Sequence, residues 1–233
     1  MIHLCLPTRS RSGSTFVNKL ALLVDSPLVK GKPAGITGSR LNNREVGGER
    51  GEFNTAYKSG NSIDYIRKKE INIIKLEDPG KDSLVREIAE SFPSCVFVAS
   101  HRSLEKTVNS HLNIKKWGHS IEDVIYQYSA CISIYEDLAK AGRLFLVNVD
   151  DPASFSPDSF CRFLKGRSCL EFEQFVQEWR PVNDLSYQKD KFGEEFHGVI
   201  EEHHQSKSLG SIHFWVAQAE AKYLKLVADS KMY

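Results

Sequence analysis

The chain has 233 residues, of which 41% are hydrophobic and 26% are charged, a composition typical of a globular protein with one well-buried core. Its 31 Lys and Arg residues nearly balance its 30 Asp and Glu residues, which excludes the overall basicity of most nucleic-acid binders. No apolar run approaches the roughly 20 residues that a membrane span needs. The five cysteines are scattered without a Cys-x-x-Cys pair, which favours reduced thiols, and no signal-peptide pattern opens the chain. We expect one cytoplasmic domain over residues 1–233 that binds neither nucleic acid nor membrane; the sequence makes no prediction of the oligomeric state.

Four short apolar runs predict buried strands, because each is rich in β-branched or aromatic residues and is bounded by turn or charged residues. These runs are Ile2–Leu6, Ile71–Leu76, Cys95–Ala99 and Leu144–Val149. Helical periodicity follows them at Thr15–Val24, at 84–88 ahead of Pro93, at Ser120–Ala139, at Leu170–Trp179 and at Ile212–Val227. Strands that alternate with helices predict an α/β fold with a central parallel sheet in three α/β/α layers.

Residues 25–62 have no clear period and are rich in Gly, Asn, Ser, Lys and Arg. A stretch of this length is either disordered or a functional lid. Its basic side chains either line the entrance for an acceptor or form an ordinary solvated loop. We therefore treat 25–62 as a loop-rich candidate lid and acceptor segment.

The first strand is followed by a Gly/Ser/Thr turn that opens a helix. Its residues are Arg11, Ser12, Gly13, Ser14, Thr15 and Phe16. The amides of such a turn and the N-terminus of the helix converge on one anion, so the pattern predicts a phosphate cradle. The Gly-Lys-Ser/Thr ending of an ATP- or GTP-binding loop is absent, and a basic residue precedes the glycine instead. The loop thus indicates a phosphorylated donor other than ATP.

A second candidate phosphate site follows the strand 95–99, where Arg102 stands at the strand end and Ser110 comes eight residues later. If a helix begins near Ser103, two turns separate the pair, and both side chains can reach one phosphate. Ligands of parallel sheets bind beyond the carboxyl ends of the strands. We expect three elements to lie at these carboxyl ends: the loop at Arg11, Glu77 and Arg102. The sequence therefore predicts one shared site.

These two motifs, in this order and strand context, resemble those of sulfotransferases that use 3′-phosphoadenosine 5′-phosphosulfate (PAPS). The resemblance covers roughly residues 2–112 and implies a P-loop nucleotide-kinase-like sulfotransferase fold. It implies that Arg11 binds the bridging oxygen and that Phe16 stacks on adenine. By the same resemblance Ser12, Gly13, Ser14 and Thr15 hold the 5′-phosphosulfate, and Arg102 and Ser110 bind the 3′-phosphate.

Lys75 and Glu77, between the two motifs, match the lysine and the general base of that family. A carboxylate suits the base position because an acceptor hydroxyl must lose its proton as the sulfuryl group arrives. Asp78 is the alternative base; neighbours on a strand point to opposite faces, so one of the two acids points inward, and we favour Glu77. Glu77, Arg11 and Lys75 are the predicted catalytic residues. No metal is expected, since built-in cations stabilise the leaving nucleotide.

The chain departs from the family pattern at several positions. Leu104 replaces a common proline, and His101 stands where an apolar strand residue is more usual. Lys165, Gly166 and Arg167 resemble the family's late basic-glycine loop in composition only; the other interpretation is a glycine cap at a helix end followed by solvated charge. These departures weaken a link to the animal phenol- and steroid-type enzymes.

The leading hypothesis is an enzyme, a PAPS-dependent sulfotransferase that moves the sulfuryl group to a hydroxyl or amine of a small-molecule or carbohydrate acceptor. PAPS is then the co-substrate. One alternative is a non-catalytic adenosine-phosphate-binding protein of the same fold. Another is a nucleoside-phosphate kinase, which needs a P-loop lysine after the glycine and then a magnesium-binding Ser or Thr, and this pattern is absent from the sequence.

Overall fold

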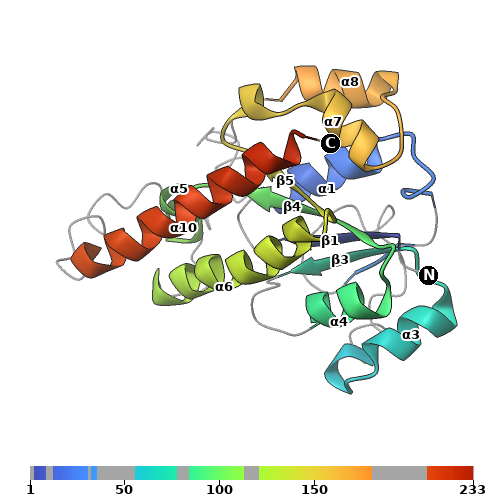
Figure 1. Ribbon diagram of the computed structural model, residues 1–233, viewed down its shortest axis with the longest axis horizontal. Helices are drawn as coiled ribbons and strands as arrows, with labels where there is room; N and C mark the ends of the chain where they lie inside the picture. Colours follow the sequence, from blue (N-terminus) through green and yellow to red (C-terminus); the bar gives the residue numbers. More distant parts are fainter. Residues whose placement is uncertain are drawn as a thin grey trace, which may run out of the picture.

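The computed structural model describes residues 3–8, 13–30, 33–35, 56–77, 84–112, 121–179 and 209–232. Within these ranges the chain is an α/β protein built on an all-parallel sheet flanked by helices (Figure 1). Four longer strands lie side by side in the order β3 (Ile73–Glu77), β1 (Leu4–Thr8), β4 (Val96–His101) and β5 (Leu144–Asn148). The prediction of a parallel α/β sheet is confirmed.

Strand β1 extends further than its apolar run predicts, because Pro7 and Thr8 continue the parallel pairing with Leu76 and Glu77 of β3. Strand pairing uses backbone groups, so it continues past the last apolar side chain. The shift carries the carboxyl end of β1 two residues closer to the Gly13 turn than the sequence indicates.

Helices connect and follow the strands. They are α1 (Ser14–Leu22), α3 (Ser62–Lys69), α4 (Leu84–Ser91), α5 (Leu104–Leu112), α6 (Ile121–Lys140), α7 (Pro157–Phe163), α8 (Leu170–Gln177) and α10 (Leu209–Ser230), with a short 3-10 turn, η2 (Pro152–Ser154). Neither α3 nor α7 was predicted from the sequence. A local signal for α7 was present, because Ser156 caps it by accepting a hydrogen bond from the Ser159 amide and Pro157 is its first residue. None of the helices in the described ranges combines the length and apolar character that a bilayer crossing requires.

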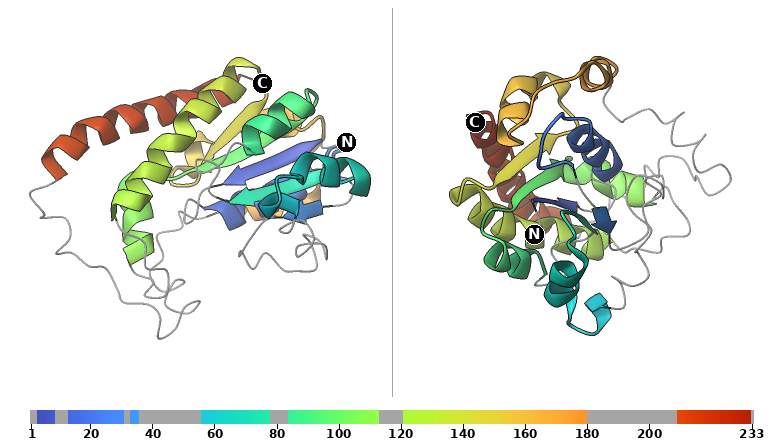
Figure 2. Two further views of the ribbon diagram at one scale, coloured as in Figure 1. Left: turned by 90° about the horizontal axis from the view of Figure 1, so that it is seen from below. Right: turned by 90° about the vertical axis from the view of Figure 1, so that its right-hand side faces the viewer.

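Alternating strand residues bury into two separate cores, one on each face of the sheet. One core joins Cys5, Ile74 and Phe97 to α4, α6 and α10, while the other joins Leu6, Val98 and further strand residues to α1, α7 and α8. Figures 1 and 2 show these helices on both sides of the sheet, with α10 running alongside α6. This two-sided cover explains why the strands read as continuous apolar runs.

The segment 25–62 contains more regular structure than its composition predicts. A three-residue strand, β2 (Pro33–Gly35), pairs in parallel with Ile73, Ile74 and Lys75 at the edge of the sheet. Ser62 is the first residue of α3. An edge strand needs one row of backbone hydrogen bonds and tolerates proline, so apolar periodicity does not reveal it. Residues 36–55, which the lid interpretation also includes, lie outside the described residues.

Candidate phosphate site at the carboxyl edge of the sheet

All the strands are parallel, so their carboxyl ends share one edge of the sheet. Thr8, the last residue of β1, is the register partner of Glu77, the last residue of β3. On the other side His101, the last residue of β4, pairs with Asn148 at the end of β5. The segments predicted to bind phosphate all begin or end at this edge.

Gly13 immediately precedes α1 and has a φ of +85°, in the left-handed region that favours glycine. A Cβ placed on Gly13 would lie 2.7 and 2.8 Å from the two methyl carbons of Val149, which follows β5. Gly13 therefore serves two purposes: it makes the turn into α1, and it allows α1 to start directly against the end of β5.

The rest of the predicted cradle is described in part. Ser14 is the half-buried first residue of α1. Thr15 follows it in the helix, and the structure describes only its backbone. Arg11 and Ser12 lie outside the described residues. The ring of Phe16, which is predicted to stack on adenine, packs on two aromatic rings. The Phe16 centroid is 4.9 Å from the centroid of Phe175 in α8 and 4.6 Å from that of Trp179, which follows α8. These contacts join α1 to α8.

Lys75 lies in the middle of β3 and is only 3% exposed. Lys75 is the register partner of Leu6 in β1. Side chains on a strand alternate between the two faces of the sheet, so Lys75 shares a face with Ile73, and Ile73 packs in the same core as α1. Lys75 is thus on the α1 side of the sheet, two residues before the carboxyl edge. The structure describes only the backbone of Glu77, and Asp78 lies outside the described residues.

Ser110 lies in α5, which begins at Leu104, close to the expected start at Ser103, and Arg102 lies two residues before this helix. Both residues are buried, with 5% of Arg102 and 2% of Ser110 exposed. Burial lowers the pKa of the Arg102 guanidinium, and the negative charge of Asp150 acts in the opposite direction. The Nε of Arg102 lies 3.7 Å from Oδ1 of Asp150.

Asp150 and Lys106 belong to this cluster, although the sequence analysis did not single them out. The Lys106 ammonium is 3.3 Å from the same Asp150 oxygen that faces Arg102. The other Asp150 oxygen accepts a 2.8 Å hydrogen bond from the Ser103 amide. Two signals were present in the sequence: Asp150 follows a predicted strand, and Lys106 lies four residues from both Arg102 and Ser110.

Helix α10 fixes the start of α5 from a distant part of the chain. Glu220 accepts a 2.8 Å hydrogen bond from the Leu104 amide and a 3.3 Å hydrogen bond from the Tyr128 hydroxyl. The His101 ring stacks on Tyr223, with centroids 4.9 Å apart and planes inclined by 17°. The unexpected histidine at the end of β4 is therefore a packing residue that joins the sheet to α10.

The loop formed by Lys165, Gly166 and Arg167 closes the end of α7. Lys165 has a φ of +52°, and Gly166 donates a 2.9 Å hydrogen bond to the Cys161 carbonyl, as in a helix C-cap. Arg167 binds the Asp25 carboxylate with a 2.9 Å contact from its Nε. The hydrogen bond favours the cap interpretation, with Lys165 rather than Gly166 as the left-handed residue. Asp25 follows α1, so the contact with Arg167 lies at the end of α1 opposite Gly13.

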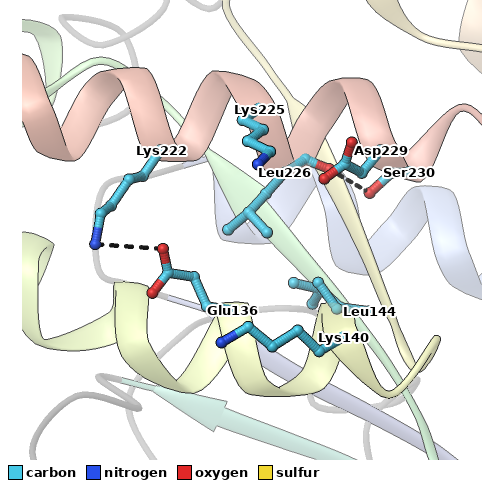
Figure 3. A pocket seen from close by; sticks show the side chains of 9 residues that line it. Glu136, Lys140, Leu144, Lys222, Lys225, Leu226, Asp229 and Ser230 are labelled. Carbon is cyan, nitrogen blue, oxygen red and sulfur yellow. Dashed lines mark hydrogen bonds and ion pairs between the residues drawn. The ribbon is translucent and has the colours of Figure 1, made fainter.

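A cavity of about 210 Å³ lies between α6 and α10 (Figure 3). Its apolar floor includes Leu144 and Leu226, and Lys140 and Lys225 line it; Lys222 forms a 3.3 Å ion pair with Glu136 beside it. Leu144 is the first residue of β5, so the cavity is at the amino end of that strand. It is separate from the cluster around Arg102.

Comparison with known proteins finds no family model that matches this chain and no curated protein that matches it. Among the described residues, no group of three or more His, Cys, Asp or Glu side chains is placed to hold a metal ion. Function is therefore inferred from the residues at the carboxyl edge themselves.

Proposed function

We propose that this protein is a PAPS-dependent sulfotransferase of the P-loop-like sulfotransferase fold. The observation that carries the proposal is that buried Arg102, which follows β4, lies near the Gly13 turn at the start of α1, with buried Ser110 in the helix that comes after Arg102. Gly13 abuts Val149, and the next residue, Asp150, contacts Arg102. Two anion-binding elements on neighbouring strands suit a donor that has separate 5′- and 3′-phosphate groups.

In the proposed reaction the acceptor oxygen or nitrogen attacks sulfur in line, its new bond to sulfur forms, and the bond from sulfur to the bridging oxygen breaks. The acceptor proton passes to the Glu77 carboxylate. Arg11 and Lys75 neutralise charge on the bridging and sulfuryl oxygens, and the turn from Ser12 to Thr15 supplies amide and hydroxyl donors. The products are the sulfated acceptor and adenosine 3′,5′-bisphosphate.

The position of Lys75 supports this assignment of roles. It lies on the face of β3 that α1 covers, and β3 neighbours the strand that leads into the Gly13 turn. The acceptor is proposed to be a small molecule or carbohydrate, and the donor needs no metal ion of its own. None of the five cysteines, which all lie in the described part of the chain, forms a disulfide, and this fits the proposed location in the reducing cytoplasm.

Thermal-shift titrations with adenosine 3′,5′-bisphosphate and with ATP test the donor class. We expect the bisphosphate to raise the melting temperature at lower concentration than ATP, and Arg102→Gln to weaken that response. Arg86→Gln is the control, because Arg86 is an exposed arginine of α4 that pairs with Asp137. Preferential stabilisation by ATP with magnesium favours a kinase and contradicts the proposal.

Transfer of labelled sulfate from PAPS to a panel of hydroxyl and amine acceptors tests for catalysis. Arg11→Ala is expected to lower turnover about 10²–10³-fold, the usual loss for one preorganised charge-stabilising group. Glu77→Gln is expected to abolish most transfer while leaving binding of the bisphosphate intact. Binding without transfer to any acceptor indicates a non-catalytic adenosine-phosphate-binding protein instead.

A further inference from the structure

We propose that Lys106 is a third ligand of the phosphate bound by Arg102 and Ser110, and that Asp150 is the resident counter-ion of this subsite when it is empty. The inference rests on the proposed function, and it names residues for which the motif resemblance has no role.

The first support is the spacing of residues 102–110. Lys106 and Ser110 both lie in α5, which begins at Leu104, and residues four apart in an α-helix are rotated by only about 40° from one another. These two residues therefore share one face of α5, and Lys106 is the one nearer to Arg102, which lies two residues before the helix.

The second support is the contact of two cations with one carboxylate oxygen. Oδ1 of Asp150 lies 3.7 Å from Nε of Arg102 and 3.3 Å from Nζ of Lys106. Charge-assisted hydrogen bonds between such groups are normally about 2.7–2.9 Å long, so Asp150 does not engage either cation at full strength. Two cations thus converge on a single carboxylate oxygen, an arrangement that suits a phosphate dianion.

The third support is the different freedom of the three side chains. Asp150 is held by the Ser103 amide at 2.8 Å, and its own amide donates a 3.1 Å hydrogen bond to Asn148. The Arg102 side chain is 6% exposed, whereas that of Lys106 is 35% exposed. The long lysine stem can therefore turn from the fixed carboxylate to a phosphate while Arg102 stays in place.

A resident counter-ion also explains how the empty subsite stays folded. Burial of an arginine is costly unless a negative charge lies near it, and the Asp150 carboxylate supplies such a charge 3.7 Å from the Arg102 Nε. When a phosphate binds, its oxygens share that function. Removal of the Asp150 charge is then expected to weaken the empty protein more than the phosphate-bound protein.

Isothermal titration calorimetry of the whole 233-residue chain tests the role of Lys106. The probes are adenosine 3′,5′-bisphosphate and adenosine 5′-monophosphate, which differ by the 3′-phosphate. We expect Lys106→Gln to weaken bisphosphate binding about tenfold or more, the loss of one charged hydrogen bond, with less than about a twofold change for the monophosphate. Lys106→Arg should retain most of the affinity. Lys140→Gln, an exposed lysine at the far end of α6, is the matched control.

The outcomes separate this inference from the proposed function. If Lys106→Gln binds the bisphosphate as well as Lys140→Gln does, while the wild type still prefers the bisphosphate, Lys106 is not a ligand and the donor assignment survives. If the wild type binds both nucleotides equally, the donor assignment itself is wrong. An equal loss for both nucleotides assigns Lys106 to general electrostatic attraction and overturns its specific role.

The role of Asp150 has its own readout. Asp150→Asn keeps an acceptor for the Ser103 amide but removes the charge between the two cations. We expect the empty variant to melt at a lower temperature, and saturating bisphosphate to raise its melting temperature by more than it raises that of the wild type. An equal or smaller increase shows that Asp150 has a structural role only.

Discussion

Replacing Gly13 with alanine separates two physical reasons for the glycine at the start of α1. The first is conformational, because a left-handed backbone costs a residue with a Cβ about 1–2 kcal/mol. The second is steric, because the new Cβ would lie 2.7 and 2.8 Å from the methyl carbons of Val149. Overpacking of this kind costs about 1–3 kcal/mol, so we expect Gly13→Ala to lower the free energy of unfolding by about 2–5 kcal/mol.

The chain offers a matched control for the conformational part. Gly60 has a φ of +73°, and a Cβ placed there would meet nothing within 4 Å. Gly60→Ala should therefore lose only the conformational contribution, about 1–2 kcal/mol. Urea unfolding of both variants, followed by circular dichroism, measures the difference between them.

A double-mutant cycle isolates the steric part. Val149→Ala removes the methyl groups that the new Cβ would meet, so Gly13→Ala should be less destabilising in that background by about 1–3 kcal/mol. If Gly13→Ala is no more harmful than Gly60→Ala, or if the cycle shows no coupling, the close approach of α1 to the end of β5 is not the reason for the glycine.

Three further predictions concern positions away from the site. Arg143 donates three hydrogen bonds of 2.8–2.9 Å to carbonyls of α4 and of the segment between α4 and β4. Arg143→Lys should therefore lower the free energy of unfolding by about 2–4 kcal/mol, as urea titration can measure. An unchanged urea midpoint would contradict this role of Arg143. Gly166→Ala should destabilise by about 1–3 kcal/mol, because its Cβ would lie 2.7 Å from the Asp25 carbonyl oxygen; a neutral result in the same assay shows that the α7 cap can move. Burial raises the pKa of the Cys95 thiol to about 12. At pH 8 iodoacetamide should therefore alkylate half-buried Cys169 first and Cys95 only after unfolding, and peptide mass spectrometry can follow this order. Early labelling of Cys95 would contradict its burial.

Periodicity predicted the main elements well, because strand and helix patterns arise from neighbouring residues. The four apolar runs all correspond to strands, and the long stripe at Ser120–Ala139 corresponds to α6. The pattern failed where backbone pairing or capping, rather than apolar side chains, defines the element. The end of β1, the edge strand β2 and the short helix α7 are such cases.

The residues of the candidate site were predicted in different ways. Local spacing singled out the Gly13 turn, Arg102 and Ser110, since each depends on residues within one strand and the helix that follows it, whereas Lys75 was singled out by the family resemblance. Asp150 and Glu220 were not predicted, because they reach the start of α5 from positions far along the chain. Residues so distant in sequence carry no spacing signal that relates them to Arg102.

The sequence by itself determined that strands alternate with helices and that glycine, serine and basic residues gather where strands end. These features depend on local backbone preferences and on the periods of 2 and 3.6 residues. Only the tertiary structure decided the strand order, which sets the end of β5 against Gly13 and brings Asp150 to Arg102 and Lys106. Strand order follows from how all the apolar faces are buried together, so a distant carboxylate becomes the partner of two local cations.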